Sequence, residues 1–333
     1  MNAAAQPPNP QTPGARVRDT AAVEFRPLFR NPHLQTVASH FWRRPRAAEP
    51  VERRILETEP GVSVLMESQH PANAAGEIVM VHGLEGAGSA GYIESLAGAA
   101  LRAGYAAHRF HMRTCGGTEH LSPTLYHAGM TGDLAAVLRR FREEGRAPAF
   151  VVGFSLGGNV VLKLAGELGE SAAELMRGAC GVSAALDLEA SSDRISNRDN
   201  RLYEARFVRK MRRRLLQTGR YTAGDLAGLN TLAAIDDRVT APSFGLGNAR
   251  NYYRTQSAVA CVDRIRIPTL LIQAKDDTIV PWQTVEHAAV RANPRIQVVL
   301  TEHGGHLGFL ARGAHRFWLD AAILHWVGEQ DAR

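Results

Sequence analysis

The chain has 333 residues, 39 basic and 33 acidic side chains, and a formal net charge of +6. Apolar residues make up 45% of it, which is enough for a sizeable core and excludes wholesale disorder. No stretch approaches the roughly 18 uncharged apolar residues of a membrane span. The three cysteines are widely spaced, which argues against a disulfide framework and indicates a reducing compartment. We therefore expect a cytoplasmic protein.

Residues 1–22 are rich in Pro, Asn, Gln and small side chains, and they lack the apolar segment of a secretory signal peptide. Such a composition buries too little surface to become ordered. We predict a disordered leader over residues 1–22 and a folded domain over 23–333.

Short apolar runs that predict strands alternate along this domain with periodic segments that predict helices. Such alternation is typical of βαβ units, and it predicts an α/β fold whose mostly parallel sheet is flanked by helices. The predicted strands lie near residues 55 and 64 and at 77–81, 105–110, 149–155, 179–186, 269–273 and 296–302. The predicted helices lie at 92–104, 133–145, 157–169, 282–292 and 315–329.

One interval is too long for a single crossover, because more than 80 residues separate the strand ending near Ala185 from the strand starting near Thr269. Its surplus, about residues 187–247, is rich in arginine and helical in pattern. We interpret it as a cap inserted over the carboxyl edge of the sheet; a surface excursion without a role is the alternative. The candidate wall residues of the cap are Leu202, Phe207, Met211 and Leu215.

Within this interval, residues 206–214 carry six positive charges in nine positions. Such a run is compatible with nucleic acid or with an anionic lipid surface. Apolar residues at helical spacing favour a solvated helix face instead. We expect no nucleic-acid partner, and we keep peripheral lipid contact as an alternative.

Ser155 is the candidate nucleophile, because Gly153–Gly157 read G-x-S-x-G between a predicted strand and a predicted helix. This strand–turn–helix setting is what a nucleophile elbow requires. A serine hydroxyl reacts only when an oriented base removes its proton. His306 is the candidate base, since it follows a predicted strand in a glycine-rich loop; His303 is its neighbouring rival.

The base in turn needs a carboxylate to fix its tautomer, and two adjacent candidates, Asp276 and Asp277, follow the strand at 269–273. Four other side chains have simpler interpretations. We expect His82 to be structural, and Cys115 to be packed in the core. No third ligand accompanies His108 and His111, so we expect no metal and no organic cofactor.

Several segments resemble the α/β-hydrolase superfamily, and more closely its YheT-like branch of esterases and lipase-like hydrolases. The resemblance implies Ser155 as nucleophile, His306 as base and Asp277 as acid, since Asp277 begins the usual D-x-x-x-P. It also implies an oxyanion hole made by the backbone amides of Leu84 and Leu156. The segments are NPHLQT (31–36), HGLEG (82–86), YHAGMTGDL (126–134), GFSLGGN (153–159), the aspartate loop and GGHLGF (304–309).

These residues together predict a serine hydrolase that cleaves short- to medium-chain acyl esters or lipid-like esters. Two alternatives remain at this point. The same triad supports acyl transfer to an alcohol, because any bound nucleophile can resolve an acyl-enzyme. The fold can also serve a binding protein without turnover, since fold alone does not imply function.

Overall fold

The structure is a computed structural model that describes residues 23–45 and 47–332, so the predicted leader lies outside the described residues. Eight strands form one sheet in the order β1-β2-β4-β3-β5-β6-β7-β8. β2 pairs antiparallel with β1 and β4, and all the other neighbours are parallel. The mostly parallel sheet is therefore confirmed. The strands are β1 (Glu52–Glu59), β2 (Val62–Gln69), β3 (Glu77–Val81), β4 (Ala106–His111), β5 (Ala149–Phe154), β6 (Met176–Val182), β7 (Thr269–Ala274) and β8 (Ile296–Thr301).

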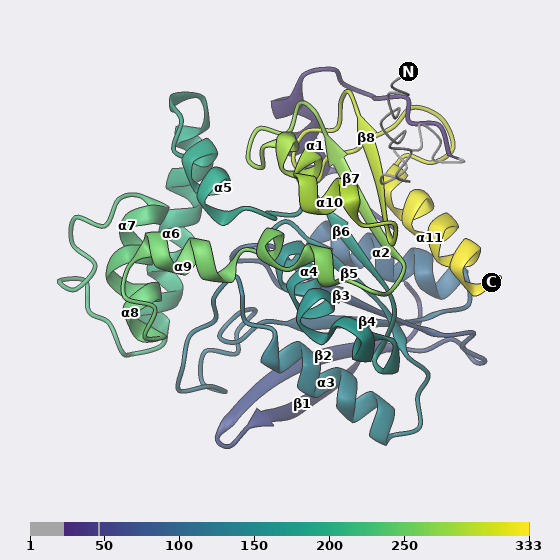
Figure 1. Ribbon diagram of the computed structural model, residues 1–333, viewed down its shortest axis with the longest axis horizontal. Coiled ribbons are helices and arrows are strands. Elements are labelled where there is room, and N and C mark those ends of the chain that lie inside the picture. The colour runs from purple at the N-terminus through teal and green to yellow at the C-terminus, as the bar shows by residue number, and fades with distance from the viewer. Residues whose placement is uncertain (1–22, 46, 333) are drawn as a thin grey trace, which may run out of the picture.

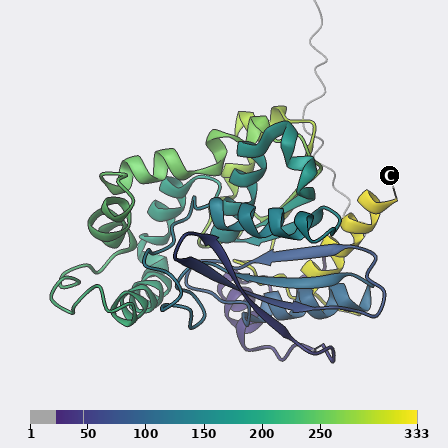
Figure 2. The same ribbon diagram turned by 90° about the horizontal axis from the view of Figure 1, so that it is seen from below.

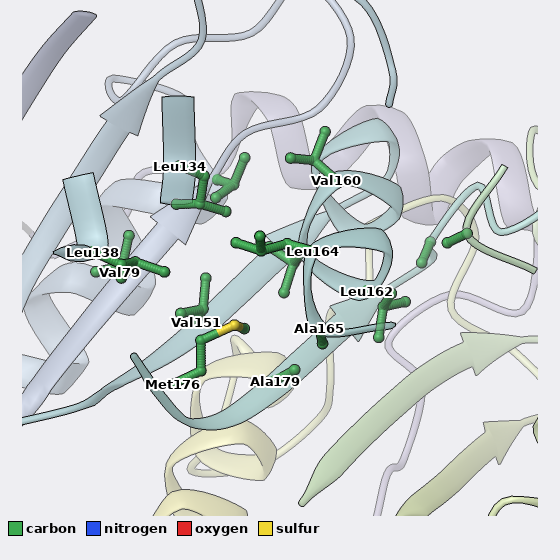
Figure 3. Close-up of a cluster of buried hydrophobic side chains, with 14 of the residues drawn as sticks. Val79, Leu134, Leu138, Val151, Val160, Leu162, Leu164, Ala165, Met176 and Ala179 are labelled. Carbon is green, nitrogen blue, oxygen red and sulfur yellow. The ribbon is translucent and has the colours of Figure 1, made fainter. Parts of the chain in front are cut away.

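Helices cover both faces of this sheet (Figure 1). α2 (Gly91–Arg102) and α11 (Trp318–Asp331) pack on one face. α3 (Gly132–Glu143), α4 (Leu156–Leu168) and α10 (Ala288–Ala292) pack on the other. Figure 3 shows part of this second core, in which Leu134, Leu164 and Met176 come from α3, α4 and β6. Because the central strands are covered on both sides, every residue of β5 is buried, which accounts for its continuous apolar run.

One predicted helix differs from the structure, and one observed helix was not predicted. The helix expected at 282–292 is a 3₁₀ turn (Trp282–Glu286) followed by the short α10. His287 separates them, because its backbone is extended and its side chain accepts a hydrogen bond from the Ala289 amide. An N-terminal helix that was not predicted, α1 (Pro32–Phe41), begins at the Asn31 cap and has proline in its first turn.

The interval between β6 and β7 is largely helical, and it lies beyond one end of the sheet in both views (Figures 1 and 2). We call its helical part, residues 188–256, the insertion. It extends past residue 247 to the end of α9, and its hydrophobic core is continuous with residues of the body, namely Leu125, Ala128, Ala185, Ile279 and Val280. It contains α5 (Leu188–Ile195), α6 (Arg201–Gln217), α7 (Leu232–Ile235), a π-helical turn (Asp236–Thr240), α8 (Ala241–Ser243), α9 (Ala249–Gln256) and the 3₁₀ turn Arg198–Asn200. Further 3₁₀ turns occur outside it at Gly169–Glu174, Ala258–Ala260 and Val262–Arg264.

The expected wall residues of the insertion divide into two groups. Met211 and Leu215 are buried in its core, and Phe207 packs against that core. Leu202 is 86% exposed, so the prediction was wrong for this residue. Helical spacing places residues on one face of a helix, but it does not say where the neighbouring elements stop. Across residues 23–45 and 47–332, none of the helices combines the length and apolar character needed to cross a bilayer.

Candidate active site

Ser155 occupies a sharp turn between β5 and α4. Its backbone has φ 53° and ψ −119°, a strained conformation for a residue with a side chain. The flanking glycines permit this turn, because a Cβ atom at Gly153 would lie 2.2 Å from the Gly157 carbonyl oxygen. A Cβ at Gly157 would lie 2.4 Å from the carbonyl oxygen of His82. The G-x-S-x-G spacing is thus required by backbone packing around the serine.

The structure brings Ser155, His306 and Asp277 together at the carboxyl edge of the sheet. Ser155 Oγ lies 3.0 Å from His306 Nε2. His306 Nδ1 lies 3.0 Å from Asp277 Oδ2 and 3.1 Å from Oδ1. The three residues follow β5, β8 and β7, respectively, and all three are buried. Parallel strands end at the same edge, and this brings loops distant in sequence into hydrogen-bonding contact.

The two adjacent aspartates have different partners. Asp277 Oδ1 accepts hydrogen bonds from the amides of Ile279 and Val280, at 2.9 and 3.0 Å, which holds its carboxylate toward His306. Asp276 instead accepts from the Gly305 amide and contacts His303 Nδ1 at 3.2 Å. Asp277 therefore contacts the imidazole of His306. Asp276 and His303 instead hold in place the loop that carries His306.

Helix α1 supports the His306 loop from the other side. The His306 amide donates to Thr36 Oγ1 at 2.9 Å. Gln35 makes a two-way contact with Leu310, donating from Nε2 to its carbonyl and accepting its amide at Oε1, both at 3.0 Å. A Cβ at Gly305 would lie 2.5 Å from the Pro32 carbonyl oxygen, so the loop needs glycine there. Sequence reasoning assigned no role to these residues; the Asn-Pro start was the available signal for a helix.

Two backbone amides near Ser155 donate to no protein atom among residues 23–45 and 47–332. Leu156 is the first residue of α4, and the first amides of a helix have no partner within it. The Leu84 amide donates to no protein atom in the described part of the chain, whereas its neighbours Gly83 and Glu85 donate to the hydroxyls of Tyr92 and Tyr126. These are the two amides that the sequence prediction named.

The Glu85 side chain is buried and paired with Arg214 of α6. Arg214 Nη2 lies 2.9 Å from Glu85 Oε1, and the two side chains are 7% and 4% exposed. Arg214 also donates to Thr114 Oγ1 at 3.0 Å and stacks over the ring of Tyr126. The last arginine of the basic run therefore joins the insertion to the loop after β3. The expected solvated helix face describes Arg206, Arg209, Lys210 and Arg213, which are exposed, but not the buried Arg214.

Comparisons with known proteins agree with this geometry. A family model described as the alpha/beta hydrolase fold matches residues 77–312. The chain is also 33% identical over 322 residues to the Escherichia coli K12 protein named "Putative esterase YheT", covering 92% of this chain and 94% of that one. The chain belongs to the α/β-hydrolase family. The match along nearly the whole of both chains confirms the YheT-like branch within it.

Other relatives and solved structures give the same family and fold. A Danio rerio protein named monoacylglycerol lipase ABHD2 is 27% identical over 326 residues, covering 89% of this chain and 76% of that protein. The structure of the Pyrococcus furiosus esterase Pf2001 superposes with a TM-score of 0.56, at 15% identity, over 85% of this hydrolase and 97% of that chain. At that identity, the likeness concerns the fold alone.

His82 of this hydrolase has the structural setting that the sequence suggested. Its Nδ1 lies 2.8 Å from the Gly83 carbonyl oxygen, and its Nε2 accepts the Met112 amide at 3.2 Å. Complete burial lowers the pKa of His82 to about 3, so the ring is neutral with one nitrogen donating and the other accepting. Both ring nitrogens are engaged by the backbone, and the ring connects the loop after β3 to the end of β4.

Two cavities of the hydrolase meet at Ser155. A cavity of about 100 Å³ is lined by Ser155, Leu84 and Leu156 together with side chains of the insertion, among them Met211 and Tyr253. A groove of about 460 Å³ is lined by Ser155 and His306 together with residues of α1 and α6. We call the first the inner cavity and the second the outer groove. The residues that line the outer groove on these two helices include Val37, His40, Phe41, Tyr203, Arg206, Phe207 and Lys210.

A further cluster lies at the amino end of β3, away from Ser155. His70 and Glu77 join His108 there, which the sequence analysis did not foresee, and their ligand atoms lie within 4.8 Å of one another. Glu77 already accepts from His108 Nε2 at 2.5 Å and also pairs with Arg146. Cys115 is buried, and burial raises the pKa of its thiol. Glu77 and His108 are therefore engaged by protein contacts, and Cys115 is packed in the core.

Proposed function

We propose that this protein is a serine hydrolase that cleaves carboxylic esters through an acyl-enzyme, with Ser155 as nucleophile, His306 as general base and Asp277 as the carboxylate that orients it. The observation that carries the proposal is the continuous hydrogen-bonded path from Ser155 Oγ through His306 to Asp277, with steps of 3.0 Å. Relatives named as esterase, monoacylglycerol lipase and phospholipase support the same reaction class.

In the proposed reaction, Ser155 Oγ attacks the ester carbonyl carbon while His306 Nε2 takes its proton. The negative charge that develops on the carbonyl oxygen is stabilised by the amides of Leu84 and Leu156. The imidazolium of His306 then gives its proton to the departing alcohol, and the carbon–oxygen bond of the ester breaks. Water repeats the two steps on the acyl-enzyme, which releases the acid and restores Ser155.

The positions of the two cavities suggest which half of the ester each one holds. The leaving alcohol must lie against His306, because His306 protonates it. His306 lines the outer groove but is absent from the wall of the inner cavity. The alcohol is therefore assigned to the outer groove, and the acyl group to the inner cavity beneath the insertion. An inner cavity of about 100 Å³ favours short to medium acyl chains.

The entrance of the outer groove supports a lipid-like substrate presented at a surface. Leu34, Val37 and Phe41 follow one face of α1, and they are 53%, 44% and 76% exposed. The neighbouring α6 contributes the exposed Leu202, and its Arg206 contacts His40 of α1. Apolar side chains beside cations suit the interface of an anionic lipid layer. Peripheral contact with such a layer is part of the proposal.

The test is covalent labelling of the purified protein with a fluorophosphonate, followed by peptide mass analysis, together with hydrolysis of p-nitrophenyl esters from acetyl to palmitoyl. We expect labelling at Ser155 and a rate optimum at short to medium chain length. Ser155→Ala should abolish labelling and lower kcat by about 10⁴-fold or more, because only oxyanion stabilisation and binding remain. A folded protein that neither labels at Ser155 nor cleaves any ester of the series would refute the proposal.

A further inference from the structure

The inner cavity contains a carboxyl group that the proposed reaction does not use. Most of its lining side chains are apolar or aromatic, but Asp236 of the insertion is among them. Ser155 belongs to the wall that the sheet contributes, whereas Asp236 belongs to the wall that the insertion contributes. A carboxyl group in an apolar pocket is costly unless hydrogen-bond donors satisfy it.

The protein satisfies this carboxyl group only in part. Tyr253 donates to Asp236 Oδ2 at 2.8 Å, and Ser192 in turn donates to the Tyr253 hydroxyl at 3.2 Å. Across residues 23–45 and 47–332, no basic side chain forms an ion pair with Asp236. An ionised carboxylate offers about four lone-pair positions. Even with the hydroxyls of Tyr253 and Thr240 nearby, it keeps capacity to accept another donor.

The ionisation of Asp236 is compatible with that role. Burial raises the pKa of Asp236 to about 6, against the opposing effect of the nearby hydroxyls and of Arg214. At pH 8 the group is therefore ionised and only accepts hydrogen bonds. Ser192 donates a hydrogen bond to the Tyr253 hydroxyl, and that hydroxyl donates to Asp236. The carboxylate of Asp236 is therefore the final acceptor of this hydrogen-bond chain.

The backbone at this position is unusual as well. Asp236 begins a π-helical turn that ends at Thr240, and both residues line the inner cavity. Single π-helical turns are rare overall, but those that occur inside helical segments are often found at functional sites. Asp237, the next residue, is instead exposed, and its carboxylate accepts the Ala249 amide.

We propose that Asp236 determines acyl specificity by accepting a hydrogen bond from a hydroxyl group on the acyl chain, so that the substrates are esters of hydroxyalkanoic acids. The inference rests on the proposed function, because it takes the inner cavity as the acyl site. A hydroxyl suits the cavity better than an ammonium group, because most of the lining is apolar or aromatic and a neutral donor costs less to bury there than a second charge.

The experiment compares p-nitrophenyl esters in matched pairs at pH 8. Each ω-hydroxyacyl ester, of 6-hydroxyhexanoate and of 8-hydroxyoctanoate, is paired with the alkyl ester in which a methyl group replaces the hydroxyl. 3-Hydroxybutanoate and its 3-methyl analogue extend the series to a short chain, and 6-aminohexanoate tests a cationic donor. We expect the wild type to prefer the hydroxyl in at least one pair by about tenfold or more in kcat/KM, since a hydrogen bond to a charged acceptor is worth about that much.

Variants make the test independent of overall activity, because the measured quantity is the ratio of kcat/KM for the two esters of a pair within one protein. Asp236→Leu should reverse the preference in favour of the alkyl ester. Asp236→Asn should turn its amide oxygen to Tyr253 and its amide nitrogen to the cavity, which favours 6-methoxyhexanoate, an acceptor, over 6-hydroxyhexanoate. Asp237→Asn is the matched control and should keep the wild-type ratio, because Asp237 is exposed and does not line the inner cavity.

The possible outcomes separate this inference from the proposed function. A wild type that cleaves the esters but prefers the alkyl member of every pair would overturn the role of Asp236, and it would leave the serine hydrolase intact. A preference that persists unchanged in Asp236→Leu would also overturn it. Loss of both labelling at Ser155 and ester cleavage in the wild type would instead refute the proposed function.

Discussion

At the residue scale, the Glu85–Arg214 pair connects the insertion to the proposed oxyanion loop. Glu85 directly follows Leu84, and its backbone lies in the left-handed region at φ 52°. Thr114 also has positive φ, and it accepts a hydrogen bond from Arg214. Arg214 thus contacts two strained positions at once. We interpret it as a positioning residue, because it acts on Leu84 through Glu85.

Replacing Arg214 tests this positioning role. Arg214→Met leaves the Glu85 carboxylate buried without its cation, which costs about 3–5 kcal/mol, and it frees the adjacent Leu84 amide to move. We expect kcat to fall by about ten- to a hundredfold, with a smaller change in KM, in assays on one soluble ester. Arg213→Met, on the exposed face of α6, is the control and should change neither value.

The double variant Glu85→Gln/Arg214→Met gives a second readout. It removes the unpaired charge, so it should recover part of the stability that Arg214→Met loses, as measured by chemical denaturation. Equal losses of stability in the single and double variants would contradict a coupled pair.

At the scale of single elements, α1 supports the His306 loop through hydrogen bonds and does not merely cover the surface. Thr36 and Gln35 bond to the backbone of His306 and Leu310, whose loop follows β8 at the other end of the chain. Thr36 donates to the Pro32 carbonyl at 2.8 Å and accepts the His306 amide. The helix start and the histidine loop are therefore joined through one hydroxyl.

Thr36→Val and Thr36→Ser separate this hydroxyl from the shape of the side chain. Valine keeps the shape but leaves the His306 amide without an acceptor, which costs about 1–3 kcal/mol when the group is buried. We expect kcat of Thr36→Val to drop by roughly tenfold, with the fold retained by circular dichroism. Thr36→Ser should restore most of the rate. Similar rates in both variants and the wild type would show that α1 does not position His306.

At the scale of the whole molecule, segments from distant parts of the chain make one surface around the outer groove. α1 comes from the start of the described chain and α6 from the insertion, and they touch through His33 and Tyr203, whose rings stack with centroids 5.7 Å apart. Two of their exposed apolar side chains, Leu34 and Leu202, lie outside the lining of the groove, whereas Val37 and Phe41 belong to it. This separation allows lipid contact to be altered without changing the groove.

Binding to vesicles tests the proposed lipid contact. Each leucine that enters the lipid interface contributes about 1.5–3 kcal/mol when fully buried, so Leu34→Ser/Leu202→Ser should weaken partitioning by about tenfold or more. The measurement is co-sedimentation with phosphatidylcholine vesicles with and without phosphatidylglycerol; the anionic lipid should strengthen binding of the wild type. Ile55→Ser, at a 61% exposed position on β1, is the control. Unaltered partitioning of the double variant would contradict the proposed surface.

Activity on a soluble ester distinguishes lipid contact from damage to the site. Leu34 and Leu202 do not line either cavity, so the double variant should keep the wild-type kcat/KM on p-nitrophenyl butyrate. Loss of both vesicle binding and ester hydrolysis in the double variant would point to misfolding of α1 instead.

Local chemistry in the sequence was sufficient for the elbow and the parallel core. The glycines around Ser155 were recognisable because no other residue fits the close backbone approach there. The continuous apolar run of β5 was recognisable because a strand covered on both faces admits few polar side chains. The same local rules also placed His306 after a strand end. They left Asp276 and Asp277 equivalent until the likeness to a family favoured Asp277.

Only the tertiary structure decided which distant groups meet. The pairing of Glu85 with Arg214, and the contact of Thr36 with His306, join segments between 129 and 270 positions apart, and no periodicity encodes such distances. Burial is likewise a property of the assembled chain: helical spacing made Leu202 and Met211 look alike, yet one is exposed and the other lies in the core. The sequence by itself determined the turns and strands, because these depend on neighbouring residues. The tertiary structure decided the partners of each buried charge, because these depend on packing between elements.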